Sequence, residues 1–401
     1  MTDDPKDWEI ATRLVRGGTM RSPFGETAEA LYLTQSYVYE TAESADARFS
    51  GADPGYIYSR YANPTVKMFE DRLALLEGAE TCRATASGMA AVHLALTGLV
   101  RAGDHVVSGK ALFGSCRWIL NNWAPRFGIE TSFVEAADPK AWRAAVRPNT
   151  KLFFIESPAN PLLEITDIAA VAAIAREIGA KVVVDNVFAT PIFQKPLKLG
   201  ADIVVYSATK HIDGQGRVLG GAVLGETALL EEAYRDIIRH TGPALSPFNA
   251  WVLLNGLVTL DLRVRAQSAA AAILADRVAA HPKVKACRYP GRSDHPQHEA
   301  ARRQFTGGGN EMIGGGNLIA FDLGTREAAF NFLNALELVD ISNNLGDARS
   351  MATHPTTTTH RSMTEEQRLE IGLTPGWVRL SVGLEGAGDL MRDLDRALDR
   401  A

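Results

Sequence analysis

Short apolar runs, separated by stretches with helical spacing, fill the middle of the chain. Runs rich in β-branched residues predict strands that are buried on both faces. Between them, apolar residues at helical spacing predict helices near 117–127 and 168–178. This alternating order predicts a doubly wound α/β fold with a mainly parallel sheet. The predicted strands are 105–107, 131–134, 151–156, 181–184, 203–206 and, closing the sheet, 222–224.

Two further helices are predicted before this region. Asn63, followed by proline, is a helix-start signal, and Gly78 follows the last residue of the periodic pattern. Ser87, Gly88 and Met89 open the second helix. Glycine in a first turn lets a ligand approach the free N–H groups closely, which suits a phosphate. Alone, this signal is weak.

Two of the predicted strands end in groups that can do chemistry. The run 203–206 leads into Ser207, Thr209 and Lys210, and the run 181–184 leads into Asp185. A lysine is most often a solvated surface charge. The carboxyl ends of parallel strands, however, open on the same sheet edge, where ligands bind. A lysine, a carboxylate and hydroxyl groups at that edge suit pyridoxal phosphate, with the lysine bonded covalently, the carboxylate at the pyridine nitrogen and the hydroxyls at the phosphate.

Residues 1–62 contain no strong periodic element, and their aromatic part, 32–61, would be poorly covered if it stood alone. We therefore expect this segment to pack on something else. An extended chain would put Tyr58 and Arg60 on one face. An exposed loop with incidental aromatic residues is an equally good interpretation of the pattern.

The last third of the chain predicts a smaller second unit. Residues 248–280 are predicted as long helix with a possible break, and 305–317 as a flexible turn before a strand at 318–321. Residues 377–383 alternate, which buries one face and points Arg379 the other way. An exposed strand arginine is the simpler interpretation of that pattern.

These motifs carry a family resemblance that spans nearly the whole chain. Lys210 and Asp185, together with the segments YSRYANPT at 58–65 and VRLSVGLE at 378–385, resemble the Cys/Met-metabolism group of fold-type I pyridoxal-phosphate enzymes. The resemblance implies an aspartate aminotransferase-like large domain and a smaller α/β C-terminal domain. It also implies three parts: an arm at 1–62 that contacts a neighbouring subunit, a cofactor-binding domain at 63–258 and a substrate-binding domain at 259–401.

The resemblance also implies a role for each motif. The neighbouring subunit supplies Tyr58 and Arg60 to the phosphate, Asn160 bonds the phenolic oxygen of the cofactor, and Arg379 binds the substrate α-carboxylate. Asn160 read alone is equally well a turn residue. Phe113 stands where most of the family has a stacking tyrosine, so stacking is kept and the phenol is absent. The implied cofactor-binding residues are Tyr58, Arg60, Gly88, Met89, Phe113, Asn160, Asp185, Ser207, Thr209 and Lys210; the implied substrate-binding residues are Asn344 and Arg379.

Three features resemble the O-succinylhomoserine sulfhydrylase branch of the family: Phe113, the run 213–217 (DGQGR) and the loop 343–347 (NNLGD). The implied reaction converts O-succinyl-L-homoserine and sulfide to L-homocysteine and succinate in methionine biosynthesis, with Lys210 as the base that removes the α-proton. Cystathionine γ-synthase, O-acetylhomoserine sulfhydrylase and a γ-lyase are alternatives on the same scaffold. A catalytically silent scaffold is disfavoured by the presence of Lys210, Asp185 and Arg379 together.

The composition and charge of the chain argue against several classes of protein. The 401 residues carry a formal net charge of -5 without a basic tract, which argues against nucleic-acid binding. No apolar run approaches the ~20 residues that span a bilayer, and the acidic, polar N-terminal sequence does not fit a secretory signal. Cys82, Cys116 and Cys287 have neither an even count nor metal-ligand spacing, so we expect reduced thiols, no metal site and a cytoplasmic enzyme. The resemblance implies a homo-oligomer, expected to be a tetramer built of dimers that share active sites.

Overall fold

Two β-sheets organise residues 4–401, the part of the chain that the computed structural model describes. The larger sheet has seven strands in the order β1-β7-β6-β5-β4-β2-β3. Strands β6, β5, β4, β2 and β3 are parallel, and β7 runs antiparallel to both of its neighbours. The predicted α/β fold is confirmed. The strands are β1 (Thr81–Thr85), β2 (His105–Gly109), β3 (Glu130–Val134), β4 (Thr150–Glu156), β5 (Lys181–Asp185), β6 (Ile203–Ser207) and β7 (Gly221–Gly225).

The sequence predicts that β7 closes the sheet as its outermost strand. This is wrong, because β1 pairs along the outer edge of β7. The sequence pattern gave no sign of β1, whose five residues, TCRAT, are mostly polar and lack a continuous apolar run. The pairing of β5 with β6 is the important one for function. It brings Asp185 and Val205 into register, so the ends of both strands open at one edge.

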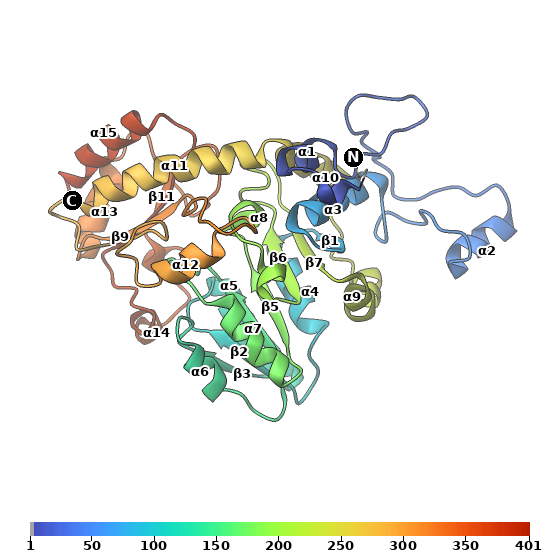
Figure 1. Cartoon of the computed structure of the whole chain (residues 1–401), viewed down its shortest axis with the longest axis horizontal. Helices are drawn as coiled ribbons and strands as arrows, with labels where there is room; N and C mark the ends of the chain where they lie inside the picture. Colours follow the sequence, from blue (N-terminus) through green and yellow to red (C-terminus); the bar gives the residue numbers. More distant parts are fainter. Residues whose placement is uncertain (1–3) are drawn as a thin grey trace.

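Helices cover both faces of the large sheet (Figure 1). Helices α6 and α7 bury their apolar residues against one face, and α4 and α9 cover the other. The predicted caps of α3 are present, since the Asn63 side chain accepts N–H bonds from the first turn and Gly78 ends the helix at φ 85°. The helices are α3 (Pro64–Glu77), α4 (Gly88–Thr97), α6 (Pro139–Ala144), α7 (Ile168–Glu177), α8 (Thr190–Phe193), η4 (Pro196–Leu199) and α9 (Thr227–Thr241).

The helix predicted near 117–127 is present, but it is not one regular α-helix. The segment instead divides into α5 (Gly114–Trp118), a π-helical turn η2 (Ile119–Trp123) and a 3₁₀ turn η3 (Ala124–Phe127). Pro125 lacks the N–H that would continue the helix. The start of α5 follows Phe113 directly, so this segment carries the predicted stacking residue to the sheet edge.

The second sheet has five strands in the order β10-β11-β12-β9-β8, antiparallel except for β10 and β11. The long helix predicted over 248–280 has its break at Thr259, between α10 and α11. Helix α11 runs from the large sheet to the second one (Figure 1). The elements are α10 (Pro247–Val258), α11 (Leu260–Ala279), β8 (Ala286–Arg288), α12 (His298–Gln304), β9 (Leu318–Asp322), α13 (Arg326–Ala335), β10 (Asp340–Ile341), β11 (Met351–Thr353), η5 (Pro355–Thr357), α14 (Glu365–Glu370), β12 (Trp377–Ser381) and α15 (Ala387–Leu398).

The N-terminal segment extends away from the body of the molecule, with α2 near its tip (Figure 1). It contains η1 (Pro5–Asp7), α1 (Ile10–Arg16) and α2 (Ala42–Ser50), short helices that its weak periodicity did not predict. The predicted arm covers 1–62, and residues 1–3 lie outside the described residues. Among the described helices, none is both long and apolar enough to cross a membrane.

Candidate active site

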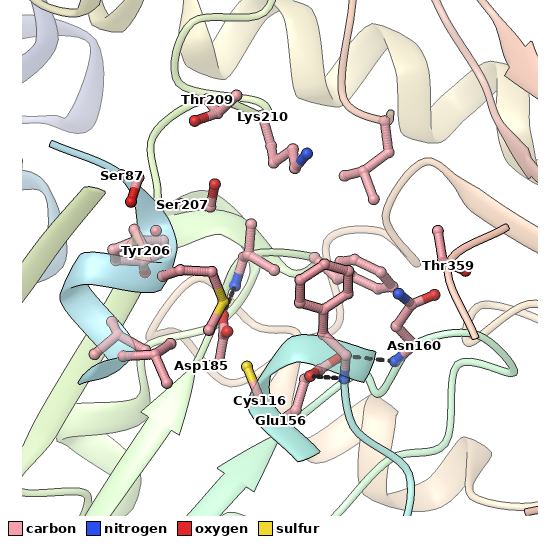
Figure 2. A pocket seen from close by; sticks show the side chains of 18 of the residues that line it. Ser87, Cys116, Glu156, Asn160, Asp185, Tyr206, Ser207, Thr209, Lys210 and Thr359 are labelled. Carbon is pink, nitrogen blue, oxygen red and sulfur yellow. Dashed lines mark hydrogen bonds between the residues drawn. The ribbon is translucent and has the colours of Figure 1, made fainter. Parts of the chain in front are cut away.

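A cavity of about 250 Å³ lies at the carboxyl edge of the large sheet, where the second sheet packs against it. Figure 2 shows Ser87 and Ser207 on one side of this cavity and Asn160 and Thr359 on the opposite side. We call it the inner cavity. Of the residues singled out from the sequence, Gly88, Met89, Phe113, Asn160, Asp185, Ser207, Thr209, Lys210 and Arg379 line it.

Lys210 follows β6 in a turn and lines the inner cavity. Its Nζ donates a hydrogen bond to Oδ1 of Asn344, 2.5 Å away. Burial and the nearby positive charge of Arg379 lower the pKa of Lys210 from 10.5 to about 8. A substantial fraction of this side chain is therefore a neutral amine near pH 8, the form that acts as a nucleophile or base.

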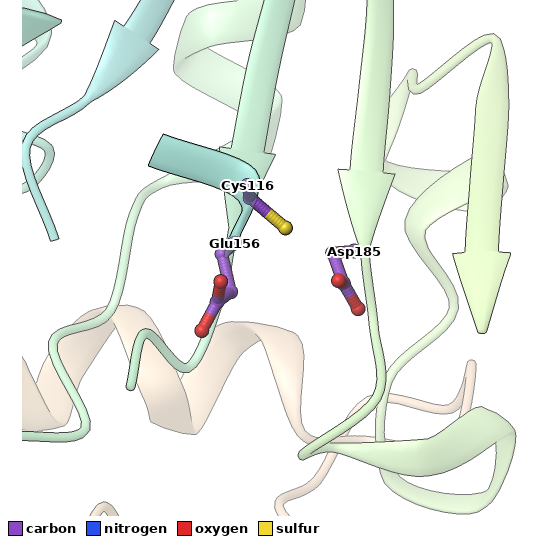
Figure 3. A group of neighbouring side chains, drawn as sticks. All are labelled: Cys116, Glu156 and Asp185. Atoms are coloured by element: carbon purple, nitrogen blue, oxygen red, sulfur yellow. The ribbon is translucent and has the colours of Figure 1, made fainter. Parts of the chain in front are cut away.

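Two buried carboxylates lie side by side at the floor of the cavity (Figure 3). Asp185 ends β5 and Glu156 ends β4, and oxygen atoms of both lie within 4.8 Å of Cys116 Sγ. Burial raises the pKa of Asp185 above its ordinary range, and burial together with Asp185 raises the pKa of Glu156. A cationic group that entered the cavity beside Asp185 would stabilise its ionised form and so offset the cost of burying the carboxylate.

The end of the cavity at the start of α4 offers neutral hydrogen-bond donors. Ser87 caps α4 through Ala90, and the backbone N–H groups of Gly88 and Met89 make no hydrogen bond within the described part of the chain. A β-carbon on Gly88 would lie 2.5 Å from Cβ of Ser207. Only glycine permits this close approach, which brings the start of α4 and the Ser207 hydroxyl to one point.

Arg379 is buried, with 2% of its surface exposed, so the simpler interpretation of an exposed strand arginine is wrong. Both faces of β12 are buried: one packs against the core, and the other lines the cavity. Arg379 donates to Oδ1 of Asn160 at 3.0 Å and to the backbone oxygen of Asn343 at 2.9 Å. Its Nε has no partner within residues 4–401. A buried guanidinium with an unused donor is suited to a carboxylate ligand.

Phe113 and Asn160 are held by one carboxylate. The backbone N–H groups of both residues donate to Glu156, each at 2.7 Å. This arrangement fixes the aromatic ring and the amide relative to Asp185. The sequence analysis did not select Glu156, although its place at the end of a buried strand is the same signal that selected Asp185.

Tyr58 and Arg60 do not line the inner cavity of their own chain. They lie in the N-terminal segment, where the Arg60 guanidinium packs over the rings of Tyr58 and Tyr61. The prediction that both act in a neighbouring subunit stays a prediction.

Comparisons with known proteins identify the family. The profile described as Cys/Met metabolism PLP-dependent enzyme matches residues 11–399. The chain belongs to this family. It is 51% identical to O-succinylhomoserine sulfhydrylase from Mycobacterium tuberculosis over 393 residues, which cover 97% of this chain and 95% of the relative. It is 42% identical to L-methionine gamma-lyase from Pseudomonas putida over 392 residues, covering 97% of each chain.

A solved structure supports the same assignment. The putative O-acetylhomoserine (thiol)-lyase from Campylobacter jejuni is 30% identical and superposes with a TM-score of 0.92, covering 98% of this chain and 100% of that one. That structure carries a pyridoxyl-lysine phosphate group. This member of the Cys/Met metabolism family is thus a pyridoxal-phosphate enzyme of fold type I, acting in methionine and homocysteine metabolism.

The residues of the inner cavity fit the cofactor of this family. At one end are the unpaired N–H groups of Gly88 and Met89 and the Ser207 hydroxyl, donors that suit a phosphate. Asp185, buried and in need of a cationic partner, suits a pyridinium nitrogen. Lys210, with its lowered pKa, suits the covalent attachment of an aldehyde.

His211 is a second residue that sequence reasoning missed. It is buried next to Lys210, and burial lowers its pKa to about 4, so it stays neutral. Its Nε2 lies 2.8 Å from Oδ1 of Asn317, whose amide nitrogen donates to the Val382 carbonyl. This chain of bonds ties the lysine turn to the strand that carries Arg379. A histidine after the lysine gave no separate signal in the sequence.

Proposed function

We propose that this enzyme converts O-succinyl-L-homoserine and sulfide to L-homocysteine and succinate. The observation that carries the proposal is the full-length identity of 51% to an O-succinylhomoserine sulfhydrylase, combined with one cavity that contains Lys210, Asp185 and Arg379. Phe113 at the cavity wall and the contact between the loop 213–217 and the residue that follows the loop 343–347, where the Ala348 N–H donates to the Gly214 carbonyl, add support. These loops and Phe113 are the features that resemble this branch of the family.

The cofactor-binding roles follow from the donor set. Gly88, Met89, Ser207 and Thr209 would hold the phosphate, and Asp185 would hold the pyridine nitrogen in its protonated form. Phe113 would stack on the ring, Asn160 would bond the phenolic oxygen, and Lys210 would be the site of covalent attachment. When bound, pyridoxal phosphate withdraws electrons from the substrate α-carbon and so acidifies its hydrogens.

The chain's own groups then carry the proton transfers. Arg379, assisted by Asn344, binds the α-carboxylate and orients the Cα–H bond towards Lys210. The Lys210 amine takes the α-proton, and a β-proton is lost before the C–O bond at the γ-carbon breaks and succinate leaves with the bonding electrons. Hydrosulfide forms the new C–S bond at the γ-carbon, and protons return to the β- and α-carbons. Because Phe113 has no phenol, Lys210 is the base and acid within this cavity.

The active site is proposed to be completed by a second copy of the chain. Tyr58 and Arg60 lie outside the inner cavity, and the segment that carries them leaves Phe24 94% exposed and Val38 98% exposed. Large apolar side chains in that state are typical of an interface. We propose that Tyr58 and Arg60 bind the phosphate in the neighbouring subunit, that two such dimers form a tetramer, and that the enzyme works in the cytoplasm with its three free cysteines reduced.

A γ-lyase activity is the second candidate, favoured by the 42% identity to L-methionine gamma-lyase. Cystathionine γ-synthase and O-acetylhomoserine sulfhydrylase would use the same residues with a different nucleophile or acyl group. The deciding experiment combines O-succinyl- and O-acetyl-L-homoserine with sulfide, with L-cysteine or with no nucleophile, includes L-methionine alone, and measures homocysteine, cystathionine and 2-oxobutanoate. We expect the largest kcat/KM for homocysteine from the succinyl ester with sulfide. A larger kcat/KM for 2-oxobutanoate from L-methionine would replace this proposal with the lyase.

A further inference from the structure

A second cavity, of about 630 Å³, adjoins the inner one and opens to the surface. We call it the outer cavity. It shares Phe113, Asn343 and Thr359 with the inner cavity, so the two spaces adjoin at these residues. The rest of its wall includes Ser342, Thr353 and Thr358. None of the residues assigned to the cofactor, except Phe113, contacts this space.

The direction of the substrate side chain follows from the fixed groups of the inner cavity. Ligand sites usually measure about 300–1,000 Å³, and the inner cavity, at about 250 Å³, must hold the cofactor as well as the substrate. Ser87 and Ser207 close the phosphate end, and Arg379 holds the α-carboxylate. An extended acyl group therefore leaves the inner cavity on the side of Thr359 (Figure 2), which together with Phe113 also lines the outer cavity.

The lining of the outer cavity is polar and carries no charged side chain. Some of its hydroxyl groups are already committed: Thr358 donates to the His354 carbonyl at 2.8 Å and lies 2.9 Å from the Thr353 hydroxyl. Ser342 Oγ accepts the Asn344 N–H at 3.3 Å, which leaves its proton free to donate. The side-chain amide of Asn343 has no hydrogen bond within residues 4–401. Ser342 and Asn343 are thus the donors that remain available.

Asn343 is also held at a fixed place relative to the proposed α-carboxylate site. Its backbone oxygen accepts a hydrogen bond from Nη2 of Arg379 at 2.9 Å, and the same nitrogen lies 3.2 Å from the Asn344 oxygen. The Arg379 guanidinium therefore positions two groups: the α-carboxylate of a bound amino acid, and Asn343, which lies beside the acyl end.

We propose that Asn343 and Ser342 bind the terminal carboxylate of the succinyl group in the outer cavity and thereby select succinyl over acetyl esters. This inference rests on the proposed function and names the acyl subsite of the same reaction. Two neutral donors stabilise a carboxylate without the desolvation cost of a buried ion pair. An acetyl ester has no second carboxylate and leaves both donors unpaired, which is the kind of mismatch that polar sites discriminate against.

Asn343→Asp tests the proposal, because aspartate has nearly the same shape and replaces the donor with a negative charge. Asn343→Ala removes the donor without adding a charge. The measured quantity is the dissociation constant of each ester, followed through the visible absorbance of the holoenzyme without sulfide. For the succinyl ester we expect Asn343→Ala to weaken binding about 10-fold and Asn343→Asp about 10- to 100-fold, since both lose a hydrogen bond to a charged group. The acetyl ester should change by less than about twofold on the same reasoning.

The ratio of the two dissociation constants isolates the acyl end, because both esters share the α-carboxylate and the amine. Asn310→Asp, an exposed change on the loop 305–317 that contacts neither cavity, is the charge-matched control and should leave the ratio unchanged. A ratio that is the same in the wild type and in both Asn343 variants would overturn the subsite. Because the absorbance is read directly after mixing, before the ester is consumed, and no sulfide is present, this result is independent of the nucleophile experiment that tests the proposed function.

Discussion

At the phosphate end of the inner cavity, the polar groups come from two short segments, 87–89 and 207–210, each attached directly to a strand of the large sheet. At the substrate end, Arg379 lies in β12 of the second sheet and Asn343 in the loop that follows β10, more than a hundred residues further along the chain. Hydrogen bonds from Arg379 to Asn160 and from Lys210 to Asn344 join the two regions. The phosphate end is therefore organised locally, whereas the substrate end depends on how the second sheet packs against the first.

This difference predicts that changes in the two regions separate cofactor binding from substrate binding. The phosphate contacts survive if the second sheet shifts, since none of them belongs to it. A change at the substrate end should weaken binding of the amino-acid substrate and leave the cofactor content unchanged.

Lys210→Ala should abolish measurable turnover, because it removes both the site of attachment and the proposed base. Loss of general acid–base catalysis alone costs about 10²–10⁴-fold, and loss of the covalent step adds to it. Cofactor should still be retained through the phosphate contacts, as measured by absorbance after dialysis. Lys140→Ala, an exposed change, is the control. A Lys210→Ala variant that keeps more than a tenth of wild-type kcat would show that another group is the base.

Arg60→Ala should lose activity because it weakens phosphate binding in the neighbouring subunit. Mixing it with Lys210→Ala should restore activity, since one site of each mixed dimer contains both intact residues. Random pairing makes half of the dimers mixed with one competent site each, so recovery should approach about a quarter of the wild-type activity. If mass spectrometry shows that subunits have exchanged and no activity returns, Arg60 acts within its own chain.

Arg379→Lys keeps the charge and loses the planar fork. Removing this charge-assisted contact should cost roughly 1.5–3 kcal/mol of binding, about 10- to 100-fold in kcat/KM. The loss should appear for every amino-acid substrate, the acetyl ester included, because all carry the α-carboxylate, while the cofactor content should not change. Arg302→Lys, on the exposed face of α12, is the control. Normal binding of the acetyl ester by this variant would place Arg379 at the acyl end instead.

The pH dependence of cofactor uptake should reflect the lowered pKa of Lys210. Attachment requires the neutral amine, which predominates above the pKa, so the rate of uptake by apoprotein should rise with pH and level off above about 8. With a lysine of ordinary pKa, the rate of uptake would keep rising to above about pH 10. Arg379→Met removes a positive charge that lowers this pKa, so its midpoint should move to higher pH. Stopped-flow absorbance measures both profiles, and a midpoint near 10 in the wild type would contradict the assignment.

Much of the phosphate end could be predicted from the sequence, and less of the substrate end. Lys210 and Asp185 were identifiable because parallel buried strands end at one edge, a rule that needs only local pattern. Alternation around Arg379 indicates that it faces away from Val378 and Leu380, but it cannot reveal that a second buried surface lies there. Glu156 ends a buried parallel strand, as Asp185 does, but its partners are two backbone N–H groups, which leave no side-chain motif that would single it out. Strand β1 was missed because its pairing with β7, rather than apolar periodicity, makes it a strand.

The most direct test of the account is the identity of the lysine that bears the cofactor, since Lys210 lies where the two regions meet. The holoenzyme would be reduced with borohydride and digested, and the pyridoxyl-labelled peptide would be sequenced by mass spectrometry. We predict a single label on Lys210, and loss of that label in the Lys210→Ala variant. A label on any other lysine, such as the buried Lys195, would contradict the assignment of the active site.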